Sequence, residues 1–138
     1  MNKTKLIVPY GIQFISEWED YIFPKGHIIV DKGVTGCGYT EYCLTNNLPI
    51  VLCSPRKLLL ENKSEQHQGD PNILYVKNDL GEYKDVLDLK TKIKSFIEYC
   101  FEELNESPKL LVTYDSSYYI RDILIEMNLQ DSFYFIID

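Results

Sequence analysis

The sequence predicts an α/β fold with three layers, in which helices cover both faces of a mostly parallel sheet. Short apolar runs of strand length alternate along the chain with segments of helical character. The chain has 138 residues, of which 45% are hydrophobic and 13% aromatic, enough for one domain with a buried core. Strands that alternate with helices form βαβ units, and such units build a parallel sheet.

Two strand-like runs occur early in the chain, at 5–8 and at 27–31. The second has the continuous apolar, β-branched character of a strand that is buried on both faces. Between the two runs, Ser16 and Glu19 have the spacing of a capping box, which predicts the start of a helix. A short helix is expected over 38–45.

A further buried strand is expected at 49–53. The helix after it is predicted to begin with Ser54 as the N-cap and Pro55 as the first helical residue. The polar segment 61–72 contains Gly-Asp-Pro and is predicted to be a loop before a strand at 73–76.

The clearest helix lies within 87–104, where apolar residues recur at 3.6-residue spacing and the opposite face is lysine and glutamate. A strand at 110–113, a helix from about 116 to 127 and a last strand at 133–137 are expected after it. The apolar face of the helix consists of Leu89, Ile93, Phe96, Ile97, Cys100, Phe101 and Leu104.

Composition and charge restrict the classes of function. The net charge is −7, so we expect no overall attraction for nucleic acid or an anionic membrane, and any such contact must be local. The four cysteines form no C-x-x-C pair and the chain has two histidines, which favours reduced thiols over a zinc site. No apolar run has the length of a membrane span, and no signal peptide is recognisable. These features predict a cytoplasmic protein without a membrane partner.

A glycine-rich segment, KGVTGCGYT, follows the strand expected at 27–31. In the phosphate-loop pattern G-x-x-x-x-G-K-[ST], the two glycines correspond to Gly33 and Gly38. Thr40 also fits the pattern, whereas Tyr39 occupies the position of the lysine. Such a loop directs backbone N–H groups toward phosphate oxygens at a helix N-terminus, and the alternative is an ordinary strand-to-helix turn. The candidate nucleotide-binding residues are Lys32, Gly33, Gly36, Gly38, Tyr39 and Thr40.

Three other expected strands end in polar residues. Ser-Pro-Arg occupies 54–56, Thr-Tyr-Asp-Ser occupies 113–116, and Asp138 follows the apolar run FYFII. Ligand sites of doubly wound sheets lie at the carboxyl ends of strands, so these segments are candidates for binding. Each also has a structural explanation. Residues 54–55 and Asp115 suit helix caps, and the tyrosines at 114, 118 and 119 suit core and rim packing better than a base-stacking platform.

Taken together, four segments in this order resemble the first RecA-like domain of a superfamily 2 helicase. GVTGCGYT is similar to motif I (Walker A), and VLCSPRKLLLENK is similar to motif Ia. LLVTYDSSYYI resembles the motif that ends in a Thr-x-Asp-Ser-type turn, and FYFIID resembles motif II (Walker B). The resemblance covers residues 27–138. TGCGYTEYCL and VLCSPRKLLLENK also resemble helicase-like proteins of tailed phages that infect Bacteroidetes.

The resemblance implies a three-layer RecA-like (P-loop NTPase) domain, the N-terminal portion of a longer protein that couples ATP hydrolysis to movement on nucleic acid. Residues 33–38 would cradle phosphate, and Thr40 and Asp138 would hold Mg²⁺, with Asp138 in the catalytic position. The protein would act in the host cytoplasm or in the virion. The residues implied to contact nucleic acid are Ser54, Arg56, Thr113 and Ser116.

Two departures from the family limit this expectation. Tyr39 replaces the lysine that neutralises phosphate charge, and Lys32, just before Gly33, is the residue expected to lean toward the phosphates in its place. The chain also stops at Asp138, before the family's catalytic glutamate and second RecA-like domain. We therefore expect this chain alone to be inactive, with ATP and Mg²⁺ bound weakly or not at all. The alternatives are a pseudo-NTPase that serves as a binding or structural module in a larger assembly, such as a phage particle, and a flavodoxin-like binding domain with a different strand order.

Overall fold

The computed structural model describes residues 10–11, 39–76 and 86–137. The chain divides into two compact units, Met1–Asn46 and Asn47–Asp138, and each is considered by itself. The elements expected at 5–8, near Ser16 and at 27–31 lie outside the described residues.

In the first unit, the described residues include helix α1 (Tyr39–Thr45), as expected from the sequence. Tyr39 and Cys43 are buried and lie one turn apart, so they share one face of the helix. Glu41 in the first turn is favourably placed for the helix dipole. The hydroxyl of Thr45 donates to the carbonyl of Glu41 over 2.9 Å and so satisfies a carbonyl of the helix.

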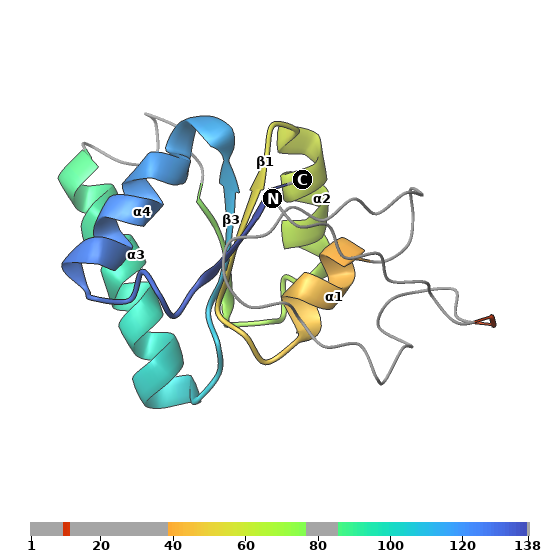
Figure 1. The fold of residues 1–138 in the computed structure, drawn as a ribbon, viewed down its shortest axis with the longest axis horizontal. Helices are drawn as coiled ribbons and strands as arrows, with labels where there is room; N and C mark the ends of the chain where they lie inside the picture. The colour runs from red at the N-terminus through yellow and green to blue at the C-terminus, as the bar shows by residue number, and fades with distance from the viewer. Residues whose placement is uncertain (1–9, 12–38, 77–85, 138) are drawn as a thin grey trace, which may run out of the picture. The chain divides into compact units, whose positions relative to one another are not determined.

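The described residues of the second unit form a four-stranded parallel sheet (Figure 1). Its strand order is β2-β3-β1-β4, and the central strand β1 pairs directly with β3 and β4. The strands are β1 (Ile50–Ser54), β2 (Ile73–Val76), β3 (Lys109–Thr113) and β4 (Tyr134–Ile137). Each lies within one residue of the strand that the sequence predicts.

Helices cover both faces of this sheet, which confirms the predicted three-layer α/β class (Figure 1). Helices α3 (Val86–Tyr99) and α4 (Ser117–Glu126) pack on one face, and α2 (Lys57–Gln66) lies on the other. All five residues of β1 and all five of β3 are buried, because both sides of these strands are covered.

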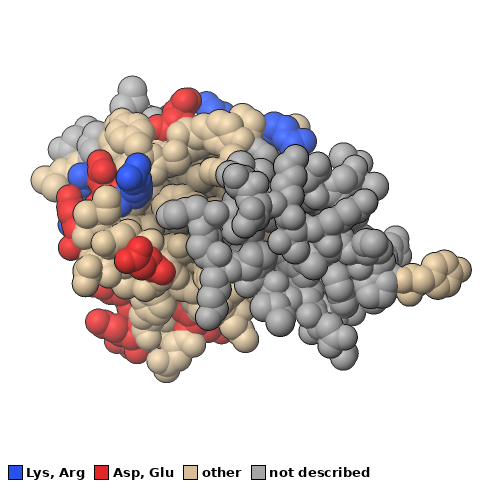
Figure 2. Space-filling view, viewed as in Figure 1, with Lys and Arg blue, Asp and Glu red and all other residues tan. Residues whose placement is uncertain are grey.

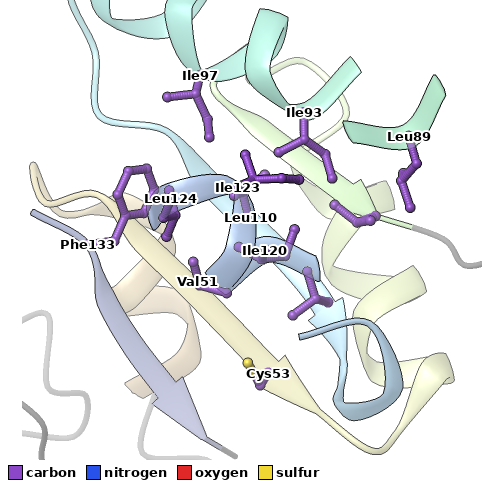
Figure 3. Close-up of a cluster of buried hydrophobic side chains, with 12 residues drawn as sticks. Val51, Cys53, Leu89, Ile93, Ile97, Leu110, Ile120, Ile123, Leu124 and Phe133 are labelled. Atoms are coloured by element: carbon purple, nitrogen blue, oxygen red, sulfur yellow. The ribbon is translucent and has the colours of Figure 1, made fainter. Parts of the chain in front are cut away.

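The larger part of the core lies between the sheet and the α3–α4 layer (Figure 3). Alternate strand residues such as Val51 and Cys53 point toward these helices, as the twofold periodicity of a strand requires. The buried residues of this core are Val51, Cys53, Val76, Leu89, Ile93, Ile97, Leu110, Val112, Ile120, Ile123, Leu124 and Phe133.

The strand order excludes the flavodoxin-like alternative. Neighbouring strands β1 and β4 are separated along the chain by two other strands of the sheet. The flavodoxin-like order 2-1-3-4-5 contains no such pair. The Rossmann order 3-2-1-4-5-6 contains one such pair. However, β1 and β3 are neighbours here although β2 lies between them in the chain, and the Rossmann order has no neighbours of that type.

Helix α2 corrects two predictions. It begins at Lys57 with Arg56 in the N-cap position, so Ser54 closes β1 and is not the helix cap. It continues to Gln66, so the first half of the predicted loop 61–72 is helical. Glu, Lys and Gln are good helix formers, and the only buried residue of α2 is Leu60, so a polar sequence suits this solvent-facing helix.

The long helix departs from α-helical geometry at its end. After α3, residues Cys100–Leu104 form a π-helical turn, and Asn105 ends it in the left-handed conformation with φ of 51°. The wider turn rotates the later residues away from the apolar face. Phe101, predicted for that face, is 38% exposed and contacts Phe133 edge-on, with ring centroids 6.4 Å apart.

Candidate functional site

The carboxyl edge of the sheet brings together segments that are far apart in the sequence. Ser54 at the end of β1 is the register partner of Thr113 at the end of β3. On the other side of β1, Cys53 pairs with Ile137, the last residue of β4. Three of the four candidate segments therefore end on neighbouring strands, as we expected for a parallel sheet.

The turn after β1 is organised by the hydroxyl of Ser54. This side chain is fully buried, and its Oγ accepts a hydrogen bond of 3.2 Å from the backbone N–H of Arg56. A bond from a hydroxyl to the N–H two residues later closes a local turn. The turn leaves Arg56 exposed at the beginning of α2.

The turn after β3 has a similar construction. Thr113 is 7% exposed and Ser116 is fully buried, and their hydroxyls lie 3.4 Å apart within hydrogen-bonding distance. Tyr114–Ser116 form one turn of 3₁₀-helix, so α4 starts at Ser117 and Ser116 is its N-cap residue, a role we had considered for Asp115. The Ser117 hydroxyl donates to the carbonyl of Tyr114 over 2.8 Å.

The four predicted nucleic-acid residues therefore occupy different environments. Ser54, Thr113 and Ser116 form the inner layer of the edge, where their hydroxyls make local hydrogen bonds. Arg56, Tyr114 and Asp115 form the outer layer and reach solvent. A ligand on this edge would meet the outer residues and the backbone N–H groups that the buried hydroxyls position.

Only two of the predicted nucleotide-binding residues are described by the structure. Tyr39 and Thr40 are the first two residues of α1, and Lys32, Gly33, Gly36, Gly38 and the metal candidate Asp138 lie outside the described residues. Tyr39, at the position of the missing lysine, is 5% exposed, and its ring lies 6.2 Å from that of Tyr42. Thr40 is half-buried.

The described cysteines, Cys43, Cys53 and Cys100, are all buried. Burial raises the pKa of Cys53 from 9.0 to about 11. Burial, with the nearby Glu106 carboxylate, likewise raises the pKa of Cys100 to about 11. Because the thiolate is the reactive form, these two cysteines are unsuited to nucleophilic chemistry at neutral pH. Within the described ranges, no group of three or more His, Cys, Asp or Glu side chains is arranged to hold a metal ion.

Sequence reasoning missed the exposure of two tyrosines beside this edge. Tyr114 is 42% exposed and Tyr118 is 54% exposed, although both were expected to pack in the core or at its rim. The signal was present in the sequence, because the buried face of α4 is defined by Ile120, Ile123 and Leu124. Helical periodicity places Tyr118 away from that face.

Comparisons with known proteins give no match to a protein-family model, a curated protein or a solved structure. Among the helices of the described residues, none is long and apolar enough to cross a membrane. The resemblance to helicases therefore depends on the four sequence segments.

Proposed function

We propose that this chain is the first RecA-like domain of a helicase-like P-loop protein that binds nucleotide and nucleic acid in its full-length form. The observation that carries the proposal is the pairing of Ser54 with Thr113 at the carboxyl ends of β1 and β3, with β4 on the other side of β1. Segments similar to motif Ia, the Thr-x-Asp-Ser-type turn and motif II thus end on adjacent strands. The resemblance implies that these segments lie at one edge of the sheet, as they do here.

In this proposal the carboxyl edge contacts the phosphate backbone of nucleic acid. Arg56 is exposed at the start of α2 and supplies positive charge. Backbone N–H groups in the first turns of α2 and α4 supply neutral donors, since helix N-termini favour anions. Ser54 and Ser116 act indirectly, because their buried hydroxyls fix the two turns.

Nucleotide binding belongs to the glycine-rich segment in the same proposal, with residues 33–38 around phosphate and Thr40 and Asp138 on Mg²⁺. Tyr39 brings no positive charge to the phosphates. Loss of one partner from a desolvated charge pair costs about 2–5 kcal/mol, or about 30-fold to several thousand-fold in affinity. Weak MgATP binding by this chain is the expected consequence.

The second candidate function is a pseudo-NTPase module that has kept the fold without nucleotide chemistry. The burial of Tyr39 favours it, because the side chain at the lysine position is only 5% exposed and its ring lies against that of Tyr42. Such a module would act through a second domain or a larger assembly.

Fluorescence anisotropy with a labelled single-stranded oligonucleotide tests the nucleic-acid half of the proposal. We expect weak binding by the parent chain and weaker binding by Arg56→Ala. Lys63→Ala is the matched control, because it removes the same charge from the last turn of the same helix. If neither Arg56→Ala nor Lys63→Ala changes the affinity, the motif Ia assignment is wrong. Arg56 is then an ordinary helix N-cap residue.

A further inference from the structure

The 3₁₀ turn before α4 and the first turn of α4 together carry three tyrosines within six residues, and none of the three belongs to the buried core. Tyr114 and Tyr118 are substantially exposed, and Tyr119 is half-buried. The core face of α4 is supplied by Ile120 and Ile123 with their neighbour Leu124. Packing in the core therefore does not account for the exposed rings of Tyr114 and Tyr118.

Two of these rings are already arranged as a pair. The ring centroids of Tyr118 and Tyr119 lie 4.0 Å apart with an interplanar angle of 32°. A hydrogen bond between the two side chains also raises the pKa of Tyr118. The orientation of the exposed Tyr118 ring is thus held by its neighbour, which lowers the entropy that a ligand must remove on binding.

One of the three tyrosines, Tyr114, lies beside the candidate phosphate contact. Tyr114 directly follows Thr113, which pairs with Ser54, and Arg56 comes two residues after Ser54. The hydrogen bond from the Ser117 hydroxyl to the carbonyl of Tyr114 fixes the connection between the strand end and the helix. The ring of Tyr114 and the exposed Arg56 therefore follow the ends of two adjacent strands, and Tyr118 and Tyr119 lie in the first turn of the helix that comes next.

The charges around the rings are nearly balanced. Arg121 is exposed one turn along α4 from Tyr118, but Asp115 and Asp122 are exposed in the same region. Figure 2 shows acidic and basic side chains interspersed over the described part of one face, without a continuous basic surface. Charge alone would hold a polyanion weakly here, whereas stacking on a ring does not depend on net charge.

We propose that Tyr118, supported by Tyr119 and accompanied by Tyr114, is a stacking platform for the unpaired bases of single-stranded nucleic acid whose phosphates lie at Arg56. This inference rests on the proposed nucleic-acid function and adds a base-stacking contact to its backbone contacts. Every base has a π-face, so the platform accepts any sequence, but it requires bases that are not enclosed in a duplex. Arg121 flanks the platform as a second cation.

Anisotropy competition on the complete 138-residue chain tests the platform with three probes of equal length, namely a thymidine oligonucleotide, its abasic analogue and a duplex. We expect the thymidine strand to bind most tightly. Stacking of one base contributes about 1–3 kcal/mol, or about 5- to 150-fold, so Tyr118→Ala should weaken binding of that strand about tenfold. Tyr118→Phe keeps the ring and should keep the affinity. Tyr99→Ala removes an exposed tyrosine at the end of α3 and is the matched control.

The possible failures are distinguishable. Equal binding of the abasic and thymidine strands would overturn the platform, and this comparison needs no variant. An unchanged affinity in a folded Tyr118→Ala chain would do the same. In both cases, binding that still depends on Arg56 would preserve the proposed function. A parent chain that binds no oligonucleotide would overturn both proposals and leave the tyrosines as a contact surface for a protein.

Discussion

At the scale of single residues, position 39 separates the two candidate functions. We expect isothermal titration to show weak or no MgATP binding by the parent chain. If the glycine-rich segment holds phosphate, Tyr39→Lys should strengthen binding by about 30-fold or more, because the amine restores the missing charge. A long lysine stem can remain in the buried site while its amine reaches polar surroundings.

Tyr42→Lys is the control for this substitution. It introduces the same charge one turn further along α1, where the native side chain is half-buried. No gain from Tyr39→Lys in a folded chain would identify the segment as an ordinary turn. Micromolar affinity in the unmodified chain would contradict the expected cost of the missing lysine, unless Lys32→Ala abolished it.

The buried thiols predict a second residue-scale effect, on stability at high pH. Cys53 and Cys100 have pKa values raised from 9.0 to about 11, so the folded state holds these protons more tightly than the unfolded state. Their contribution to stability is complete below pH 9 and is lost as the pH rises through about 11. Urea unfolding at pH 7, 9 and 10.5 measures this loss.

The double variant Cys53→Ala/Cys100→Ala serves as the reference for that experiment. Its stability should be lower at pH 7, because two buried side chains are truncated, but it should fall less steeply above pH 9 than that of the parent. Parallel pH dependences for the two chains would show that the thiols ionise as easily in the folded state as in the unfolded one.

At the scale of elements, α4 offers a matched pair of isoleucines. Ile123 is fully buried in the core, whereas Ile125, two residues later, is 49% exposed. Ile123→Ala should lower the free energy of unfolding by about 2–5 kcal/mol, through lost burial and the cavity left behind. Ile125→Ala should have a much smaller effect. Denaturant unfolding followed by circular dichroism compares them, and equal losses would mean that the face assignment of α4 is wrong.

The elements also show what the sequence could predict. The described strands were located within a residue, because each is an apolar run bounded by polar residues or turn formers. The second half of α2 was missed, because the polar run ENKSEQ suits both a loop and a solvent-facing helix. The π-helical turn after Tyr99 has no sequence signal that we recognised, so Phe101 was misplaced.

Tertiary packing accounts for the features that local patterns could not supply. Lys109 is fully buried, and its Nζ donates to the carbonyl of Leu48, a contact between segments distant in the sequence. The strand order also could not be predicted from local patterns, since it depends on how the βαβ segments pack within the sheet. Of the candidate site, the sequence predicted the grouping of strand ends but not that Ser54 and Ser116 would be buried.

At the scale of the whole molecule, the net charge of −7 opposes binding to a polyanion. Nucleic acid must then be held through local contacts. We assign the contact at the strand-end turns to the exposed Arg56, and the exposed Arg121 lies further along α4. Few counterions should be released when the complex forms. Salt dependence therefore reports how much of the binding is electrostatic.

The most direct test of the proposed nucleic-acid site is the slope of log K against log salt for a labelled single strand, measured for the parent chain and for Arg56→Ala. We expect weak binding with a shallow slope of roughly −1 to −2 for the parent, because few phosphates are neutralised. Arg56→Ala should reduce the magnitude of the slope by about 1. Tight binding with a steep slope would reveal a basic surface elsewhere on the chain, and a slope that Arg56→Ala leaves unchanged would contradict binding at the carboxyl edge of the sheet.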